Sequence, residues 1–387
     1  MADVHVVGGG PAGCFAGIAA LQAGKNVLLS EEHKKIGEPE ACSGLISKSG
    51  LDSLLPYINY KEVMLNTINS AKIVSGPLSA PQKGAPFSLR EKEGRQEFII
   101  KPKEETAILV SRQGLDRLAA ARFEEEGGKL ELGKKITREF AAKAVIGADG
   151  PASAVADYFG FPKISSYVAT MQGNFRYACA DAHQTTVYLS SKDFPGFFGW
   201  AIPISEEEAK IGIGVGLPRH PLPYYRRFLA SLGVSSAPSN EFAAVIPTSV
   251  RKKTAMQKGG YSILLAGDSA GQVKSTTGGG IFFGAQCGLL AGAHADDPAG
   301  YEAEWRKKYG LDLALHRHFR TLLDVGGGQP HPLFLSAAKM MFFEDLLSER
   351  GKMDRWGAML SPSTVSSYLG IVKKRITGGD MPVLPEK

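Results

Sequence analysis

Three glycines near the N-terminus have the spacing of a phosphate-binding turn. Gly8, Gly10 and Gly13 follow a short apolar run at residues 4–7 and open a segment rich in small residues. In such a turn the first glycine permits the bend, the second lets the backbone approach a pyrophosphate, and the third allows close helix packing. The N-terminus of the following helix adds N–H donors and a positive dipole. The pattern therefore predicts a dinucleotide site.

A carboxylate stands where such a site needs one. Glu31 ends a second apolar run at residues 26–30, which completes a strand–helix–strand unit with the glycine turn. A carboxylate at that strand end can accept hydrogen bonds from ribose hydroxyl groups, and its charge would repel a 2′-phosphate. We therefore expect a nucleotide without a 2′-phosphate here.

Two later motifs repeat the arrangement of a strand followed by a carboxylate and glycine. Asp149-Gly150 follows the apolar run 144–147, and Gly267-Asp268 follows the run 264–266. A glycine-rich stretch at residues 278–280 then opens an apolar helix. A carboxylate beside a glycine-rich helix start suits the ribityl hydroxyl groups and the pyrophosphate of a flavin.

The elements that must position these residues form a discontinuous arrangement. Residues 1–165 and 255–295 are predicted to form a Rossmann-like nucleotide-binding domain, because parallel strands need crossover helices. Residues 166–254 contain short alternating segments that indicate an inserted antiparallel-sheet domain for the substrate. Residues 296–372 are expected to be a helical region, and 373–387 a tail. The predicted fold class is therefore mixed α/β.

Composition narrows the functional classes. Hydrophobic residues make up 43% of the 387 residues and charged residues 22%, with a formal net charge of +6. These values are typical of a globular protein, and the sequence shows no dense basic stripe that would indicate nucleic-acid binding. It contains no CxxC pair and no HExxH motif, so we expect no metal site. No signal peptide or spanning segment is apparent.

Taken in order, these motifs resemble the FAD-dependent para-hydroxybenzoate hydroxylase-like superfamily. The carrying residues are the glycine turn with Glu31, Ser111-Arg112-x-x-Leu115-Asp116, Asp149-Gly150 and Gly267-Asp268. Within that superfamily, Phe197-Phe198-Gly199-Trp200-Ala201-Ile202-Pro203 with Gly212-x-Gly214 is similar to the aromatic motif of geranylgeranyl reductases. Ala41-Cys42-Ser43-Gly44 and residues 277–281 resemble segments of the archaeal digeranylgeranylglycerophospholipid reductases. The resemblance covers about residues 1–290.

The resemblance implies FAD as the cofactor and assigns residues to it. The implied cofactor-binding residues are Gly8, Gly10, Ala12, Gly13, Glu31, Cys42, Arg112, Ile136, Asp149, Gly267, Asp268, Gly280 and Ile281. Ile136 would contact the adenine through its backbone. Phe198, Trp200 and Pro203 would line the substrate pocket, and the Cys42 thiol is the candidate catalytic group. The sequence departs from the family pattern in two places. The family usually has an arginine three positions after the serine that matches Ser153, and here Ala156 occupies that position. The stretch 133–143 is shorter than the strand excursion usual in the family.

The implied activity is that of a flavin-dependent oxidoreductase that saturates C=C bonds of geranylgeranyl chains in membrane lipid biosynthesis. The expected partners are a geranylgeranylated lipid and an electron donor, either NAD(P)H or a small redox protein. A cytoplasmic protein in peripheral contact with the inner face of the membrane is expected. Apolar and aromatic walls suit such a substrate, since each buried CH₂ contributes about 0.8 kcal/mol.

Several interpretations stay open at this stage. A flavin-dependent monooxygenase or halogenase would share the FAD motifs, and a non-catalytic carrier of prenyl lipids would use FAD structurally. The aromatic motif could be sheet core, and Cys42 could be a small buried hydrophobe. Lys274 could lie on the surface or meet a phosphate, and residues 333–347 form either a packed helix or a membrane-facing amphipathic one.

Overall fold

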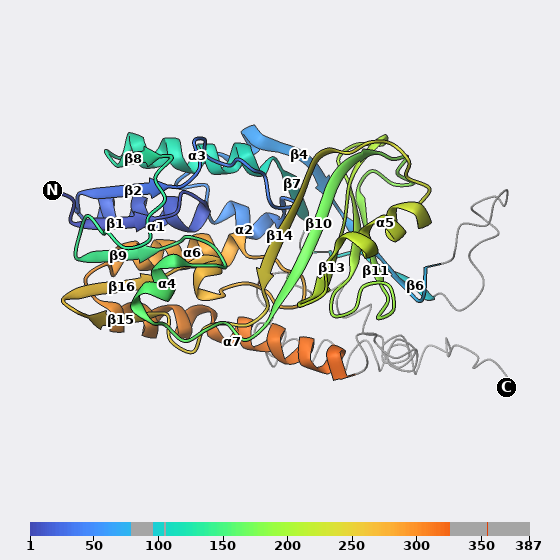
Figure 1. Ribbon diagram of the computed structural model, residues 1–387. Helices are drawn as coiled ribbons and strands as arrows, with labels where there is room; N and C mark the ends of the chain where they lie inside the picture. The colour runs from blue at the N-terminus through green and yellow to red at the C-terminus, as the bar shows by residue number, and fades with distance from the viewer. Residues whose placement is uncertain (79–95, 104–105, 326–353, 355–387) are drawn as a thin grey trace, which may run out of the picture.

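The computed structural model describes residues 1–78, 96–103, 106–325 and 354. Within them, a parallel sheet flanked by helices lies beside a second, mostly antiparallel sheet (Figure 1). The predicted mixed α/β class, with a Rossmann-like part and an antiparallel part, is confirmed. Most of the predicted C-terminal region after residue 325, the amphipathic candidate at 333–347 and the tail at 373–387 lie outside the described residues.

The first sheet carries the glycine turn. Its order is β15-β16-β9-β1-β2-β8, in which all neighbours pair in parallel except the antiparallel edge strand β15. Its strands are β1 (Val4–Val7), β2 (Val27–Glu31), β8 (Lys129–Leu132), β9 (Ala144–Gly147), β15 (Ala255–Lys258) and β16 (Tyr261–Leu265). The carboxyl ends of β1, β2, β9 and β16 lead into the sequence motifs, so one edge of this sheet gathers them.

Helices cover both faces of this sheet. The helices of this part are α1 (Pro11–Gln22), α3 (Arg112–Glu125), α4 (Ala154–Phe159) and α6 (Ile281–Ala293). Helices α1 and α6 approach each other closely because small residues meet along them: a Cβ added at Gly288 would lie 2.3 Å from the carbonyl oxygen of Ala12, and one at Gly292 would lie 2.1 Å from that of Ala16. This contact brings the N-terminal ends of both helices to the same edge of the sheet (Figure 1).

The second sheet has the order β14-β10-β13-β12-β11-β5-β6. Its strands are β5 (Ser70–Ser75), β6 (Gln96–Ile100), β10 (Tyr167–Arg176), β11 (Gln184–Leu189), β12 (Gly199–Pro203), β13 (Glu208–Gly216) and β14 (Ser239–Pro247). Helix α5 (Leu222–Ser231) packs Tyr225 and Phe228 against one face, which holds Phe175, Ile211 and Ile213. Strand alternation turns the intervening residues to the opposite face, here called the inner face.

Two strands of the second sheet come from within the range predicted for the nucleotide-binding domain. β5 and β6 lie at residues 70–100, yet β5 pairs in parallel with β11, and β6 pairs with β5. The nucleotide-binding domain is therefore interrupted earlier than the predicted boundary at residue 165. The cause is a pairing between segments more than a hundred residues apart, for which the local pattern carries no signal.

The remaining elements connect the two sheets. A small sheet of order β3-β7-β4 links them, and a long helix runs along both parts in Figure 1. These elements are β3 (Leu45–Ser47), α2 (Lys48–Asp52), η1 (Tyr60–Val63), β4 (Met64–Ile68), β7 (Ala107–Val110), η3 (Gly267–Ala270) and α7 (Pro298–Val325). In the described part of the chain, every helix is too short or too polar to cross a membrane.

Candidate functional site

The glycine turn has the geometry that a bound pyrophosphate requires. Gly8 has a φ of +105°, and a Cβ at Gly13 would lie 1.9 Å from the carbonyl oxygen of Gly8, so neither position accepts a side chain. Gly10 caps α1, and a Cβ there would meet nothing within 4 Å. The helix N-terminus is therefore open where its N–H groups could bind phosphate oxygens.

Glu31 stands directly against this turn. One carboxylate oxygen accepts a hydrogen bond from the Gly9 N–H at 2.6 Å, and the other accepts from the His33 N–H at 2.8 Å. The His33 ring Nδ1 lies 2.6 Å from the same oxygen. A carboxylate has about four acceptor sites, so Glu31 retains capacity for ribose hydroxyl groups. His33 was not identified from the sequence, because its role depends on this local turn.

Asp268 supplies a second carboxylate, at the end of β16. Gly267 has a φ of +71°, and a Cβ there would lie 2.8 Å from the Ala12 Cβ, so the turn touches the start of α1. Within the described residues no hydrogen bond or ion pair reaches the Asp268 carboxylate. Burial raises the pKa of Asp268 to about 6, an effect that the charge of Arg112 partly offsets. Such an acceptor suits the hydroxyl groups of a ribityl chain.

The start of α6 lies beside Asp268. Gly280 caps this helix and Ile281 is its first residue; a Cβ at Gly280 would lie 3.1 Å from Asp268 Oδ1. The N-termini of α1 and α6 therefore meet the turn that carries Asp268, as the sequence motifs predicted. The open N-terminus of α1 and a buried carboxylate that has no polar partner among the described residues lie at one sheet edge, and they fit a flavin dinucleotide.

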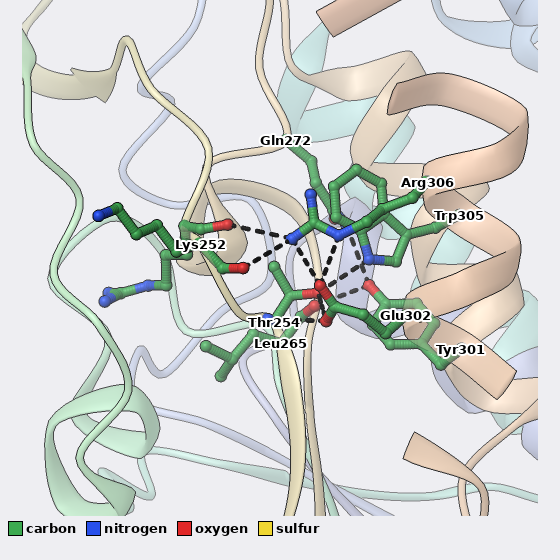
Figure 2. Close-up of polar contacts among 9 residues, drawn as sticks. Lys252, Thr254, Leu265, Gln272, Tyr301, Glu302, Trp305 and Arg306 are labelled. Atoms are coloured by element: carbon green, nitrogen blue, oxygen red, sulfur yellow. Dashed lines mark hydrogen bonds and ion pairs between the residues drawn. The ribbon is translucent and has the colours of Figure 1, made fainter. Parts of the chain in front are cut away.

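Tyr301 of α7 bonds to Leu265 and Gln272, which lie on either side of the Gly267–Asp268 turn (Figure 2). The Tyr301 hydroxyl group donates to the carbonyl oxygen of Leu265 at 2.7 Å and accepts from Gln272 Nε2 at 3.1 Å. The Gln272 side chain in turn accepts from the Gly267 N–H at 2.9 Å. Tyr301 is fully buried, so these bonds are shielded from water.

A second network fixes the same helix to the sheet edge. Thr254 donates two hydrogen bonds to Glu302, and the Trp305 indole N–H donates to the Thr254 hydroxyl group at 2.8 Å (Figure 2). Neither network was anticipated from the sequence, because the partners lie about 30 to 50 residues apart.

Arg112 and Cys42 lie close to each other at the start of α3. Arg112 begins α3 and forms a buried ion pair with Asp116, with nitrogen–oxygen distances of 3.0–3.2 Å. Burial opposes its charge, but Asp116 and the Cys42 thiol outweigh that effect and raise the pKa of Arg112. Cys42 Sγ also accepts a long contact from the Gly44 N–H at 3.4 Å. Cys42 is thus a half-buried thiol beside a fixed positive charge.

Two predicted cofactor residues point elsewhere. The Asp149 carboxylate caps α4, where it accepts from the Ser153 hydroxyl group at 2.6 Å and from the Val155 N–H at 3.0 Å. Its backbone, but not its carboxylate, lies against the Gly8 turn. Ile136 packs with Phe140 on the sheet face opposite to α1. A contact of either residue with FAD stays a prediction.

The sequence allowed two interpretations of Lys274, a position on the surface or a contact with a phosphate group. The structure buries it, and its ammonium group pairs with Asp354 Oδ1 at 2.6 Å. A surface position is therefore wrong, and the phosphate contact stays a prediction. Asp354 also bonds to the Ser47 hydroxyl group, so it links this lysine to β3.

The aromatic motif forms a wall on the inner face of the second sheet. The rings of Phe197 and Phe198 stack with centroids 4.2 Å apart, and Trp200 meets Phe198 edge-on at 5.7 Å. Glycines on the neighbouring strand make room for them. A Cβ at Gly212 would lie 2.5 Å from the Trp200 ring, and one at Gly214 would lie 2.3 Å from the Phe197 ring. The Gly212-x-Gly214 spacing therefore serves the aromatic side chains.

This wall reaches the glycine-rich start of α6. A Cβ at Gly278 would lie 3.4 Å from the Phe197 ring and 3.1 Å from Ile246 of β14. The predicted substrate side and the predicted cofactor side thus meet at this loop. Pro203 does not take part: it pairs with Ala209 and lines a cavity of about 170 Å³ on the α5 side of the sheet. Because Pro203 and Trp200 are three positions apart, strand alternation places them on opposite faces, and a contact of Pro203 with the substrate stays a prediction.

The comparisons with known proteins agree with this geometry. Residues 3–54 match the family model described as FAD dependent oxidoreductase. Digeranylgeranylglycerophospholipid reductase 2 of Methanothermobacter thermautotrophicus is 27% identical over 367 residues, covering 84% of this chain and 89% of the relative. Digeranylgeranylglycerophospholipid reductase 1 of Methanococcoides burtonii is 29% identical over 346 residues, covering 81% of each.

Solved structures share the fold. A geranylgeranyl bacteriochlorophyll reductase-like protein from Thermoplasma acidophilum matches with a TM-score of 0.71 and 19% identity, covering 97% of this chain and 98% of the other. A flavin-dependent halogenase matches with a TM-score of 0.61 and 16% identity, covering 97% and 78%. The predictions of FAD as the cofactor and of a flavin-dependent oxidoreductase are confirmed. The chain resembles the geranylgeranyl reductase family, as its motifs predicted.

Proposed function

We propose that this protein is a FAD-dependent reductase that saturates C=C bonds of geranylgeranyl chains, with prenylated glycerophospholipids as substrates. The observation that carries the proposal is the contact between the aromatic wall and the glycine-rich start of α6. It places an apolar surface beside the end of the sheet where the cofactor motifs gather. The names of the relatives point to the same lipid class.

In this proposal, one group of residues binds the cofactor and another binds the substrate. Gly10 leaves the N-terminus of α1 open for phosphate oxygens, and Gly280 places the start of α6 beside Asp268. Glu31 and Asp268 accept hydrogen bonds from sugar and ribityl hydroxyl groups. FAD, when bound and reduced, supplies a hydride to one alkene carbon. The rings of the aromatic wall bind the chain and exclude water, and each CH₂ that they bury contributes about 0.8 kcal/mol.

Cys42 takes a positioning or proton-holding role in this proposal. Its thiol lies beside the buried guanidinium group of Arg112, which is paired with Asp116. We propose that Cys42 shapes the pocket next to the cofactor and holds a proton near the second alkene carbon. Replacement by Ser keeps the size and the hydrogen bonding of the group, whereas replacement by Ala removes both, so the two variants separate packing from proton handling.

The electron donor and the membrane contact belong to the same proposal. The sequence has one GxGxxG turn, so the donor is a transient NAD(P)H or a small redox protein and not a second bound dinucleotide. A lipid substrate resides in the membrane, so we place the protein in the cytoplasm, in peripheral contact with the inner face of the membrane.

An anaerobic experiment tests the activity. The flavin of the purified protein is reduced with dithionite, geranylgeranylated glycerophospholipid is added, and flavin reoxidation is followed together with mass spectrometry of the lipid. We expect reoxidation and a gain of two mass units per double bond. An unchanged lipid with a flavin that stays reduced would indicate a carrier. Rapid reoxidation and product hydroxylation or halogenation only after oxygen is admitted would indicate a monooxygenase or halogenase.

A variant pair tests the wall. Trp200→Ala removes the indole ring, and we expect it to weaken lipid reduction more than FAD retention. Trp200→Phe keeps an apolar ring and serves as the matched control. Equal loss of lipid reduction and of FAD in the alanine variant would contradict the assignment of Trp200 to the substrate pocket.

A further inference from the structure

Three polar residues lie next to the aromatic wall on the inner face of the second sheet. Gln172 and Asn174 are on β10, and Lys210 is on β13; we call them the polar cluster. Cross-strand register places Gln172, Gly212 and Trp200 in one row. The next row holds Asn174 and Lys210. The polar cluster therefore continues directly from the ring of Trp200, and the proposed function has not used it.

The Gln172 side chain is oriented by the aromatic wall. It is 1% exposed, and its Oε1 accepts a hydrogen bond from the Trp200 indole N–H at 2.9 Å. An indole can only donate, so this bond fixes which end of the amide faces the ring. The Nε2 group is left buried without a hydrogen-bond partner among the described residues. Because buried donors are almost always paired, this one is available to a ligand atom that accepts.

Asn174 adds an acceptor beside this donor. Its Oδ1 atom is also buried without a hydrogen-bond partner in the described part of the chain. Gln172 and Asn174 are two positions apart on one strand, so both side chains point to the same face. A donor and an acceptor thus lie together at the end of the aromatic wall.

The charge of Lys210 is already compensated. Its ammonium group lies 3.0 Å from Glu40 Oε1, and the side chains of the pair are only 2% and 15% exposed. An anion such as phosphate would have to compete with Glu40 for this buried lysine. The polar cluster is therefore close to neutral and fits an uncharged group that carries oxygen.

An open cavity lies next to the polar cluster. Glu40 and Phe242 line an open cavity of about 760 Å³ between the loop after β2 and strand β14. Phe242 pairs with Gln172 in the sheet, and Glu40 bonds to Lys210, so two residues of the cavity wall are direct neighbours of the polar cluster.

We propose that the polar cluster binds the uncharged ether or hydroxyl oxygen at the head of the isoprenoid chain, while the chain itself lies along Trp200 and Phe198. The Gln172 amide donates to that oxygen, and Asn174 accepts from it when it is a hydroxyl group. This inference rests on the proposed function and specifies the orientation of the substrate. A charged head group then stays outside the cluster, on the side of the open cavity.

Binding to the oxidised holoenzyme tests the inference without turnover. Geranylgeraniol, its methyl ether, the matched hydrocarbon without oxygen and geranylgeranyl phosphate are titrated, and the change in flavin absorbance gives each dissociation constant. We expect the alcohol and the ether to bind about five- to tenfold more tightly than the hydrocarbon, the effect of one to two net hydrogen bonds. Equal affinity for the hydrocarbon would overturn the proposal.

Two variants at position 172 separate ligand binding from support of Trp200. Gln172→Glu keeps an oxygen to accept the indole N–H but removes the donor, whereas Gln172→Met removes both. We expect Gln172→Glu to abolish the preference for the alcohol and ether while the affinity for the hydrocarbon stays within about twofold of that of the unmodified protein. If Gln172→Glu retains the preference and only Gln172→Met loses it, the glutamine acts through Trp200 alone and the proposal fails.

The remaining outcomes distinguish this inference from the proposed function. Tighter binding of geranylgeranyl phosphate than of the alcohol, lost in Lys210→Gln, would make the cluster an anion site and refute the proposal. A clear preference for the alcohol, together with no lipid reduction in the anaerobic experiment, would support the polar cluster and reject the reductase. Reduction of the lipid without any preference for the alcohol over the hydrocarbon would support the reductase and reject the polar cluster as a binding site.

Discussion

The fit between Gly212 and Trp200 gives a sharp prediction, because one added methyl group should move the aromatic wall and leave the cofactor side intact. In Gly212→Ala, the new Cβ would lie 2.5 Å from one carbon of the Trp200 ring and 2.8 Å from the Met171 carbonyl oxygen. The backbone oxygen is held in the sheet, so the ring must move by about 1 Å to reach ordinary contact distance. This movement breaks the indole bond to Gln172, which is 2.9 Å long.

The expected loss of stability in Gly212→Ala follows from two effects. Overpacking costs about 1–3 kcal/mol and the lost hydrogen bond about 0.5–1.5 kcal/mol, so the free energy of unfolding should fall by about 2–4 kcal/mol. A displacement of about 1 Å beside the reacting atoms lowers kcat/KM by about 100-fold. Flavin content per protein should not change, because the cofactor motifs belong to the other sheet and its helices.

The assay compares Gly212→Ala with Gly216→Ala on the same strand. A Cβ at Gly216 would have its nearest neighbour at 3.7 Å, so this control adds a methyl group without a clash. Denaturant unfolding, flavin content and kcat/KM for lipid reduction are measured for both variants. The reasoning is refuted if Gly212→Ala reduces the lipid as fast as Gly216→Ala does, or if it loses flavin in parallel with activity.

Three further predictions concern the cofactor side. Tyr301→Phe removes both hydrogen bonds of the hydroxyl group, so we expect about 1–3 kcal/mol of lost stability and weaker FAD retention, measured by unfolding and by flavin content after dialysis. Because the pKa of Asp268 is raised to about 6, the folded protein holds a proton between about pH 4 and 6 that the unfolded chain has released. The contribution of Asp268 to the free energy of unfolding of the FAD-free protein should therefore fall as pH rises through this range. This contribution is measured as the difference between the unmodified protein and Asp268→Asn, and a difference that does not change with pH would contradict the assignment. Gly288→Ala places a Cβ 2.3 Å from the Ala12 carbonyl oxygen and should destabilise the protein by about 1–3 kcal/mol in a thermal melting experiment. The control is Gly310→Ala, whose Cβ has its nearest atom at 3.6 Å. In the same experiment it should be neutral or stabilising by up to about 1 kcal/mol.

The cofactor motifs could be predicted because each depends on a short stretch of chain. The turn at Gly8, the strand end at Glu31 and the turn at Gly267 are local features, and the structure brings them to one edge of one sheet. Asp149 shows the limit of this approach. A carboxylate after a strand can bind a ligand or cap the next helix, and Ser153 completes a cap that captures it.

The substrate side depended on register across strands, which the sequence does not reveal. Gly212 matters because Trp200 and Gln172 occupy its row, although they come from strands 28 residues apart. The face of Pro203 could not be predicted either, because the register of β12 (Gly199–Pro203) sets which residues alternate to the inner face. Lys210 and Glu40 are 170 residues apart and could not be linked by any local pattern.

Helix α7 contacts both parts and so fixes the distance between the cofactor motifs and the aromatic wall. Near its start, Tyr301 bonds to Leu265 and Gln272, on either side of the turn that carries Asp268 (Figure 2). Near its other end, Arg320 donates to the carbonyl oxygens of Gly196 and of Ser275, and its guanidinium group lies 5.2 Å from the centre of the Phe197 ring. One helix thus fixes both the cofactor turn and the aromatic motif, as its course along both parts in Figure 1 suggests. Since hydride transfer requires contact distance between donor and acceptor atoms, a rigid helix that spans both parts fixes a distance that loops alone would leave variable.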